Sequence, residues 1–171
     1  MNKPFIHLRT LSSYSLSEST LKVHNLVNHA KLYNMPSIAI TDNNNMFGVF
    51  EFSQECIRNN IQPIIGTSIN LLDVSFKNQI SQISFLVKNN IGYKNLLHLS
   101  SLSHLNDFKD VGINLSQIKD HQDGLFCFIG GEYNPLILLK RQNRVDDINK
   151  FTDKIKKLFN DNFLFEIQRI N

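Results

Sequence analysis

The sequence predicts an α/β fold in which β-strands alternate with helices. The stretch Ser37–Asp42 places a short, mostly apolar run directly before a polar loop, and an amphipathic run, Phe47 to Asn59, follows it. This order is typical of a buried parallel strand, a loop at its carboxyl end and a helix. Similar units recur along the chain. The alternation favours parallel strands with right-handed crossovers, arranged as an α/β barrel or as an open sheet.

Six strands are expected, each a short run of apolar and β-branched or aromatic residues. They are Phe5–Leu8, Ser37–Ile40, Ile64 to about Leu71, Ile83–Val87, Gly124–Ile129 and Phe163–Ile167. The polar residues between the third and fourth strands predict a loop or a hairpin turn. The last strand has no helix after it, which would leave part of the sheet uncovered and suggests an incomplete domain.

Helices are expected where apolar residues recur every three or four positions. The first follows a cap at Ser17 or Ser19 and ends near Asn34, before Pro36. The others are Phe47–Asn59 with Phe50, Phe52 and Ile57, Ile91–Ser103, a short helix at Leu115–Ile118, Leu136 to about Gln142 started by Pro135, and Asp146–Phe159 with a core stripe of Ile148, Phe151, Ile155 and Leu158.

Length and composition indicate one soluble domain. The chain has 171 residues, 42% of them hydrophobic, and a net charge of +3. No apolar run reaches the roughly 20 residues that span a bilayer, and the first residues lack a signal sequence, so a cytoplasmic protein is expected. Cys56 and Cys127 lie on apolar stretches and are expected to be small buried side chains.

Several common chemistries are not supported by the sequence. The Ser-rich loop after residue 11 lacks a nucleophile elbow, and no glycine-rich phosphate loop is present. The basic cluster Lys154–Lys157 is interpreted as the solvated face of a helix. No basic stripe with interleaved aromatic residues supports direct binding of single-stranded nucleic acid.

Four stretches in order carry a family resemblance, and Glu166–Arg169 is a fifth. They are Phe5–Arg9 with Tyr14 and Ser15, Ala39–Asp42 with Phe47 and Gly48, Gln62–Gly66, and Leu86–Asn90 with Gly92, Tyr93, Asn95 and Leu96. Together they resemble the PHP (polymerase and histidinol phosphatase) domain at the N-terminus of bacterial DNA polymerase III alpha subunits. The resemblance implies a distorted parallel β/α barrel, here incomplete with six of about seven strands. Residues 1–171 would be the N-terminal part of the PHP domain, without palm, fingers or thumb.

Metal-bearing members of this family bind several divalent ions, which activate water against a phosphate ester. The resemblance places their ligands at positions where this chain differs. Arg9 and Leu11 occupy the His-x-His positions, Asn43 a His position, Ser68 a Glu position, Gln82 a His position and Gly131 a Cys position. His7, Asp42 and Glu166 remain. We therefore expect no metal or other cofactor and no catalytic residue in this chain.

Arg9 suggests what replaces the metal. Its guanidinium is permanently charged and suits paired carboxylates, so we expect it to bridge Asp42 and Glu166. Asp42 could instead be only a helix cap. His7 is expected to be a hydrogen-bonded core histidine. The other histidines are expected on the surface: His24, His29, His98, His104 and His121.

The resemblance implies a non-catalytic domain of a replicative DNA polymerase. The domain would brace the rest of the alpha chain and dock the proofreading exonuclease subunit, and would contact DNA only indirectly and no membrane. One alternative is a PHP-type metal-dependent phosphoesterase or proofreading nuclease, against which the missing ligands argue. A stand-alone binding protein is the other. Whether the chain has enzymatic activity stays open at this point.

Overall fold

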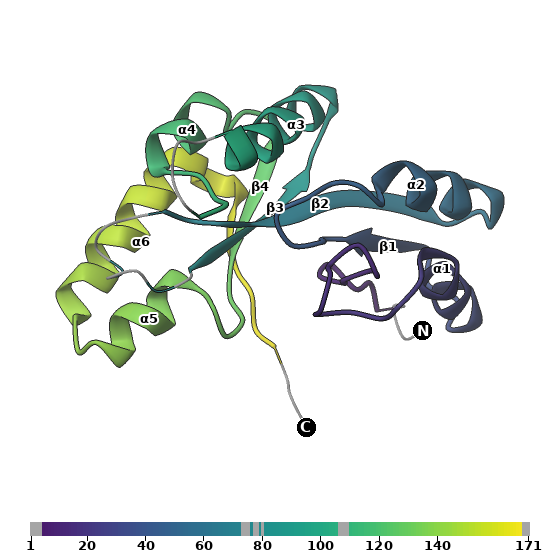
Figure 1. Cartoon of the computed structure of the whole chain (residues 1–171), viewed down its shortest axis with the longest axis horizontal. Helices are drawn as coiled ribbons and strands as arrows, with labels where there is room; N and C mark the ends of the chain where they lie inside the picture. Colours follow the sequence, from purple (N-terminus) through teal and green to yellow (C-terminus); the bar gives the residue numbers. More distant parts are fainter. Residues whose placement is uncertain (1–4, 73–75, 77–78, 80, 106–109, 169–171) are drawn as a thin grey trace.

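The fold was analysed in a computed structural model, which describes residues 5–72, 76, 79, 81–105 and 110–168. It is an α/β fold built on one five-stranded sheet in the order β1-β2-β3-β4-β5 (Figure 1). The strands are β1 (Ser37–Ile40), β2 (Gln62–Asn70), β3 (Gln82–Val87), β4 (Leu125–Ile129) and β5 (Phe163–Phe165).

The helices lie close to where the apolar periodicity predicts them. They are α1 (Val23–Leu32), α2 (Val49–Arg58), α3 (Asn90–Leu105), α4 (Leu115–Asp120), α5 (Pro135–Arg141) and α6 (Val145–Phe159), with a short 3₁₀ helix at Asn160–Asn162. Pro135 starts α5 as expected, and the Asn134 side chain accepts hydrogen bonds from the first turn. None of the helices in the described part of the chain is both long and apolar enough to cross a membrane.

The sheet is mixed, so the expectation of an all-parallel sheet is wrong. β1 pairs with β2 and β4 with β5 in parallel, but β3 runs antiparallel to both of its neighbours. The cause lies in the connection between β2 and β3, which is short because β2 ends at Asn70 and β3 begins at Gln82. A short connection of this kind joins antiparallel strands. A closed barrel is not seen among the described residues.

The expected first strand is also absent. Residues 5–8 run beside β1, where the Ala39 N–H donates to the His7 carbonyl, but they form no ladder. The described sheet therefore has five strands instead of six. The first helix begins at Val23 and has no side-chain cap from Ser17 or Ser19. Residues 13–18 form turns instead, and Ser12 and Ser15 bind a buried carboxylate described below.

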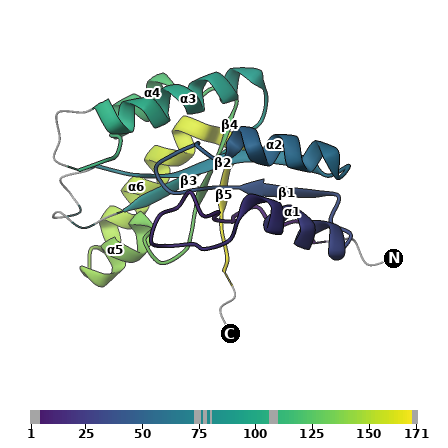
Figure 2. The same cartoon turned by 45° about the vertical axis from the view of Figure 1, so that its right-hand side comes forward.

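The buried apolar side chains form two clusters, which divide the molecule into two lobes. The N-terminal lobe (residues 5–65) packs α1 and α2 around β1, and the C-terminal lobe (residues 66–168) packs α3 to α6 around β3 and β4. Figures 1 and 2 show α1, β1 and α2 gathered on the right, α5 and α6 on the left, and α3 and α4 along the top. Strand β2 runs through both lobes. Its first half pairs with β1, and its second half, from Gly66, pairs with β3.

Helix faces follow the predicted stripes only in part. In α6, Phe151 and Ile155 are buried as expected. In α2, Phe52 is buried but Phe50 and Ile57 are 75% and 65% exposed, so these two are not core residues.

Candidate functional site

Asp42 lies two residues after the end of β1 and is almost completely buried, at 2% exposure. The loop after Arg9 supplies its partners. The Ser12 N–H donates to Oδ1 at 2.6 Å, the Ser12 hydroxyl to Oδ2 at 2.6 Å and the Ser15 hydroxyl to Oδ1 at 2.7 Å. Three donors satisfy a buried charge that would otherwise be costly. Asp42 is therefore the anchor of the Ser-rich loop. The expectation that it caps a helix is wrong, because α2 begins only at Val49 and has no side-chain cap.

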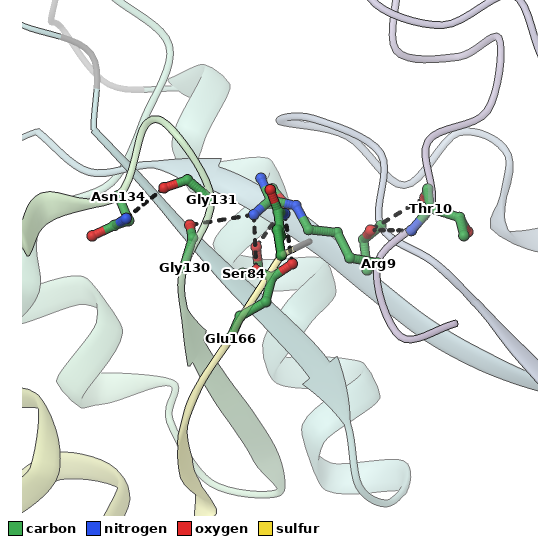
Figure 3. A network of polar contacts seen from close by, with 10 residues as sticks. Arg9, Thr10, Ser84, Gly130, Gly131, Asn134 and Glu166 are labelled. Atoms are coloured by element: carbon green, nitrogen blue, oxygen red, sulfur yellow. Dashed lines mark hydrogen bonds and ion pairs between the residues drawn. The ribbon is translucent and has the colours of Figure 1, made fainter. Parts of the chain in front are cut away.

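Arg9 lies at the start of this loop and reaches across to the last strand. Its Nη1 lies 3.0 Å from Glu166 Oε2 and donates a longer bond, 3.4 Å, to the Gly130 carbonyl (Figure 3). Gln168 Nε2 donates to the other carboxylate oxygen, Oε1, at 2.7 Å. The expected pairing of Arg9 with Glu166 is thus present. The expected pairing with Asp42 is wrong, because the serines satisfy that carboxylate instead.

Two glycines make room for this ion pair. Gly131 has φ +73°, and a Cβ there would lie 2.7 Å from Arg9 Nη1. A Cβ at Gly130 would lie 2.3 Å from the Cβ of Glu166. A cysteine at position 131, which the family resemblance would place there, could not share this space with the guanidinium in its present position.

The polar side chains at the remaining predicted positions form hydrogen bonds with other residues. Ser68 is fully buried and shares a 2.8 Å hydrogen bond with the Ser84 hydroxyl. Gln82 Nε2 donates to Asn70 Oδ1 at 3.2 Å. The Asn43 amide donates to Glu18, while its Oδ1 is buried without a partner among the described residues.

His7 is exposed and makes an edge contact with the Phe5 ring, so the expectation of a core histidine is wrong. The segment lies at the margin of the sheet, where its side chains are not covered. Leu11 is half-buried and contributes no ligand atom. His24, His29, His98 and His104 are exposed and His121 is half-exposed, which broadly confirms the surface placement. Within the described ranges, no three His, Cys, Asp or Glu side chains lie close enough together to hold a metal ion.

Both cysteines are buried, as predicted. Burial raises the pKa of Cys56 to about 12 and that of Cys127 further, so neither thiol is a nucleophile at neutral pH. Near the Asp42 loop, the Tyr14 hydroxyl donates to Glu51 at 2.9 Å, and this hydrogen bond raises the pKa of Tyr14.

A groove of about 920 Å³ lies beside the Arg9–Glu166 pair. One wall comes from the N-terminal lobe and the other from the C-terminal lobe. It is lined by Phe5, Ile6, His7, Leu8, Arg9, Thr41, Ser84, Leu86, Phe128, Glu166, Ile167 and Gln168. The sequence did not single out Ser12, Ser84 or Gly130 as members of this region. A run of four serines in the first loop was a visible signal for Ser12, whereas Ser84 lies inside an ordinary strand pattern.

The sequence profile of the PHP domain matches residues 7–170. The chain is 34% identical to DNA polymerase III subunit alpha of Rickettsia bellii, over 99% of the chain and 14% of that protein. It is 37% identical to the subunit of the same name from Borreliella burgdorferi, over 96% of the chain and 15% of that protein. It thus spans only a small part of the length of these relatives.

Among solved structures, a putative metal-dependent phosphoesterase from Bifidobacterium adolescentis covers 88% of the chain and 54% of its own, with 15% identity and a TM-score of 0.43. The match over residues 7–170 carries the assignment. The chain belongs to the PHP domain family.

Proposed function

We propose that this chain is the PHP domain of a replicative DNA polymerase III alpha chain, with an ion pair in place of the family's metal centre. The domain is a non-catalytic scaffold. It braces the rest of the alpha chain, where the polymerase active site lies, and it docks the proofreading exonuclease subunit in the cytoplasm. Its contact with DNA is indirect. The polymerase assignment rests on identities of 34% and 37% over almost the whole chain.

The Arg9–Glu166 pair is the observation that carries the non-catalytic part of the proposal. A guanidinium 3.0 Å from the carboxylate occupies the place where a divalent ion would have to bind that carboxylate. A fixed positive charge repels a cation at this distance.

The residues around the pair do not fit the family's metal either. Leu11 has no donor atom, the Ser68 hydroxyl is paired with Ser84, and Gly131 has no side chain. The carboxylate of Asp42 is buried against hydroxyl donors, which can stabilise its charge without a metal. Divalent zinc, manganese or iron sites need several imidazole, thiolate or carboxylate ligands that converge on one point. We therefore derive no step of a reaction through a metal at this site.

Elemental analysis for zinc, manganese and iron tests this part of the proposal, combined with phosphomonoesterase and phosphodiesterase assays on the same purified sample. We expect less than stoichiometric metal and no turnover. The triple variant Arg9→His/Leu11→His/Gly131→Cys is the matched comparison, because it restores three of the family's ligands. We expect it to retain more metal than the native chain. Stoichiometric metal with turnover in the native chain would contradict the proposal and favour a PHP-type phosphoesterase.

Docking of the exonuclease is tested separately. The full alpha chain and the proofreading exonuclease from the same organism are mixed and analysed by size-exclusion chromatography, with an alpha chain lacking residues 1–171 as control. We expect co-elution with the full chain and its loss with the shortened one. Equal co-elution of both alpha chains would contradict a docking role for this domain.

A further inference from the structure

Two lobes with separate cores meet along a boundary. The apolar clusters of the lobes contain different buried residues, and the half-buried Met46 packs against both. At the carboxyl ends of the strands, the lobes are joined by backbone hydrogen bonds such as Ser68 N–H to Asp42 O at 3.1 Å and Asn44 N–H to Ser68 O at 2.7 Å. A little further along, His104 Nε2 lies 2.7 Å from the Asn44 carbonyl. These contacts fix one side of the boundary.

The opposite side of the boundary is open. The groove lies there, with residues 5–9 and Thr41 on one wall and Ser84, Leu86, Phe128 and 166–168 on the other. Its walls are largely apolar and do not pack together. They enclose a space of about 920 Å³. Apolar packing therefore holds each lobe together but does not close this side of the molecule.

One ion pair crosses this open side. Arg9 extends from the N-terminal lobe to Glu166 of the C-terminal lobe, as Figure 3 shows. The side chains of Arg9 and Glu166 are 21% and 16% exposed, so water screens their attraction less than that of a fully exposed pair. Other ion pairs seen among the described residues, such as Arg58–Glu55 and Arg144–Asp147, lie within a single lobe.

The lobes stay joined along the middle of β2. Residues 62–65 pair with β1 and residues 66–70 with β3, but Ser68 also bridges to Asn43, so the N-terminal lobe is bonded to β2 on both sides of Gly66. Gly66 is closely packed, because a Cβ there would lie 2.3 Å from the Phe85 carbonyl oxygen. The place about which the lobes could turn is therefore this joined side of the boundary, opposite the groove.

From these observations we propose that Arg9 and Glu166 form a latch between the lobes, and that releasing the latch lets the lobes turn about the joined side of the boundary and widen the groove. Gly131 is part of this latch, because any side chain there would displace the guanidinium. Gln168 orients the free carboxylate oxygen. The inference concerns the motion of the lobes and goes beyond the scaffold role proposed above, since it requires neither partner.

Pulsed dipolar spectroscopy on the whole chain tests the latch. Spin labels are attached to cysteines introduced as Asn25→Cys in α1 and Asn149→Cys in α6, both exposed positions. The native cysteines are fully buried and will not react in the folded chain. We expect a narrow distance distribution in the labelled parent. Arg9→Ala and Glu166→Gln should each shift it to longer distances and broaden it.

Arg58→Ala is the matched control, because it breaks an ion pair within the N-terminal lobe and should leave the distribution unchanged. Circular dichroism establishes that each variant is folded. If Arg9→Ala does not fold, Glu166→Gln keeps the test valid, since it preserves the size of the side chain beside Gly130. Distributions that match the parent in the folded latch variants, or a shift of equal size in Arg58→Ala, would overturn the proposal.

Discussion

The two lobes achieve stability in different ways. Among the described residues, the C-terminal cluster contains 17 buried apolar side chains and the N-terminal cluster 10. The smaller cluster is accompanied by a buried carboxylate, Asp42, which gathers the first loop through three hydrogen bonds. A small apolar core buries too little surface to be stable alone. Buried polar contacts and packing against a neighbouring lobe then contribute a larger share of the stability. We infer that the N-terminal lobe depends on Asp42 and on the C-terminal lobe for its structure.

Removing a large aromatic residue from each core gives the largest expected effect. Phe52 in α2 and Phe85 in β3 are both fully buried, one in each lobe. Substitution of either by alanine should lower the free energy of unfolding by about 3–5 kcal/mol, because a buried phenyl ring leaves a cavity. Chemical denaturation measures the loss. Hydrogen exchange then locates it, and we expect faster exchange mainly in the lobe that carries the substitution. Equal acceleration in both lobes would show that they form one cooperative core.

Asp42→Ala tests the difference between the two lobes more specifically, because it removes a polar anchor that is present in the N-terminal lobe alone. It leaves the Ser12 N–H and two serine hydroxyls without their acceptor in a buried site. Since an unpaired buried donor costs about 1–3 kcal/mol, we expect a loss of roughly 3 kcal/mol in the free energy of unfolding. Asp153→Ala, at an exposed position of α6, is the control and should change stability little. A similar result for both variants would mean that Asp42 does not anchor the loop.

The sequence predicts the parts of this structure that depend on local pattern. The helices follow from apolar stripes such as Phe151 and Ile155 in α6, and the β1 strand from four residues before a polar loop. The direction of β3 depends on the connection that precedes it, and strand composition carries no information about that direction. Residues 5–8 have strand composition, but no ladder forms there, so His7 is exposed instead of buried.

The candidate site could also be predicted only in part from the sequence. Charge complementarity suggested the Arg9–Glu166 pair across 157 positions of sequence. Charge complementarity also predicted a pairing of Asp42 with Arg9, because it does not consider that neutral hydroxyl and N–H groups can satisfy a buried carboxylate. Ser12 and Ser15 take that role, and only the three-dimensional path of the loop brings them to the carboxylate. The room that Gly131 provides is likewise a property of backbone position and not of the residue pattern.

Gly131→Ala tests the boundary between the lobes. The residue has φ +73°, where a side chain costs about 1–2 kcal/mol, and the new Cβ would meet Arg9 Nη1. We expect a loss of about 1–2 kcal/mol in the Arg9→Ala background, where only the backbone conformation contributes, and a larger loss in the native background, where the collision is added. Thermal or chemical denaturation of the four proteins measures this difference. An identical loss in both backgrounds would attribute the effect to backbone conformation alone.

The smallest effect is expected for the ion pair itself. A double-mutant cycle with Arg9→Ala and Glu166→Gln should give a coupling energy of about 0.5–1 kcal/mol, because the pair is partly exposed and uses one guanidinium nitrogen. The coupling should fall in 1 M NaCl, where the screening length is about 3 Å. The corresponding cycle on Arg58 and Glu55, which lie within α2, should give a coupling no larger than this. A latch therefore need not contribute much to global stability, because a weak contact placed far from the turning point can still restrict the relative motion of two lobes that are stable in themselves. A coupling energy near zero together with unchanged label distances would show that the ion pair does not control the width of the groove, and that Arg9 has no role at the boundary.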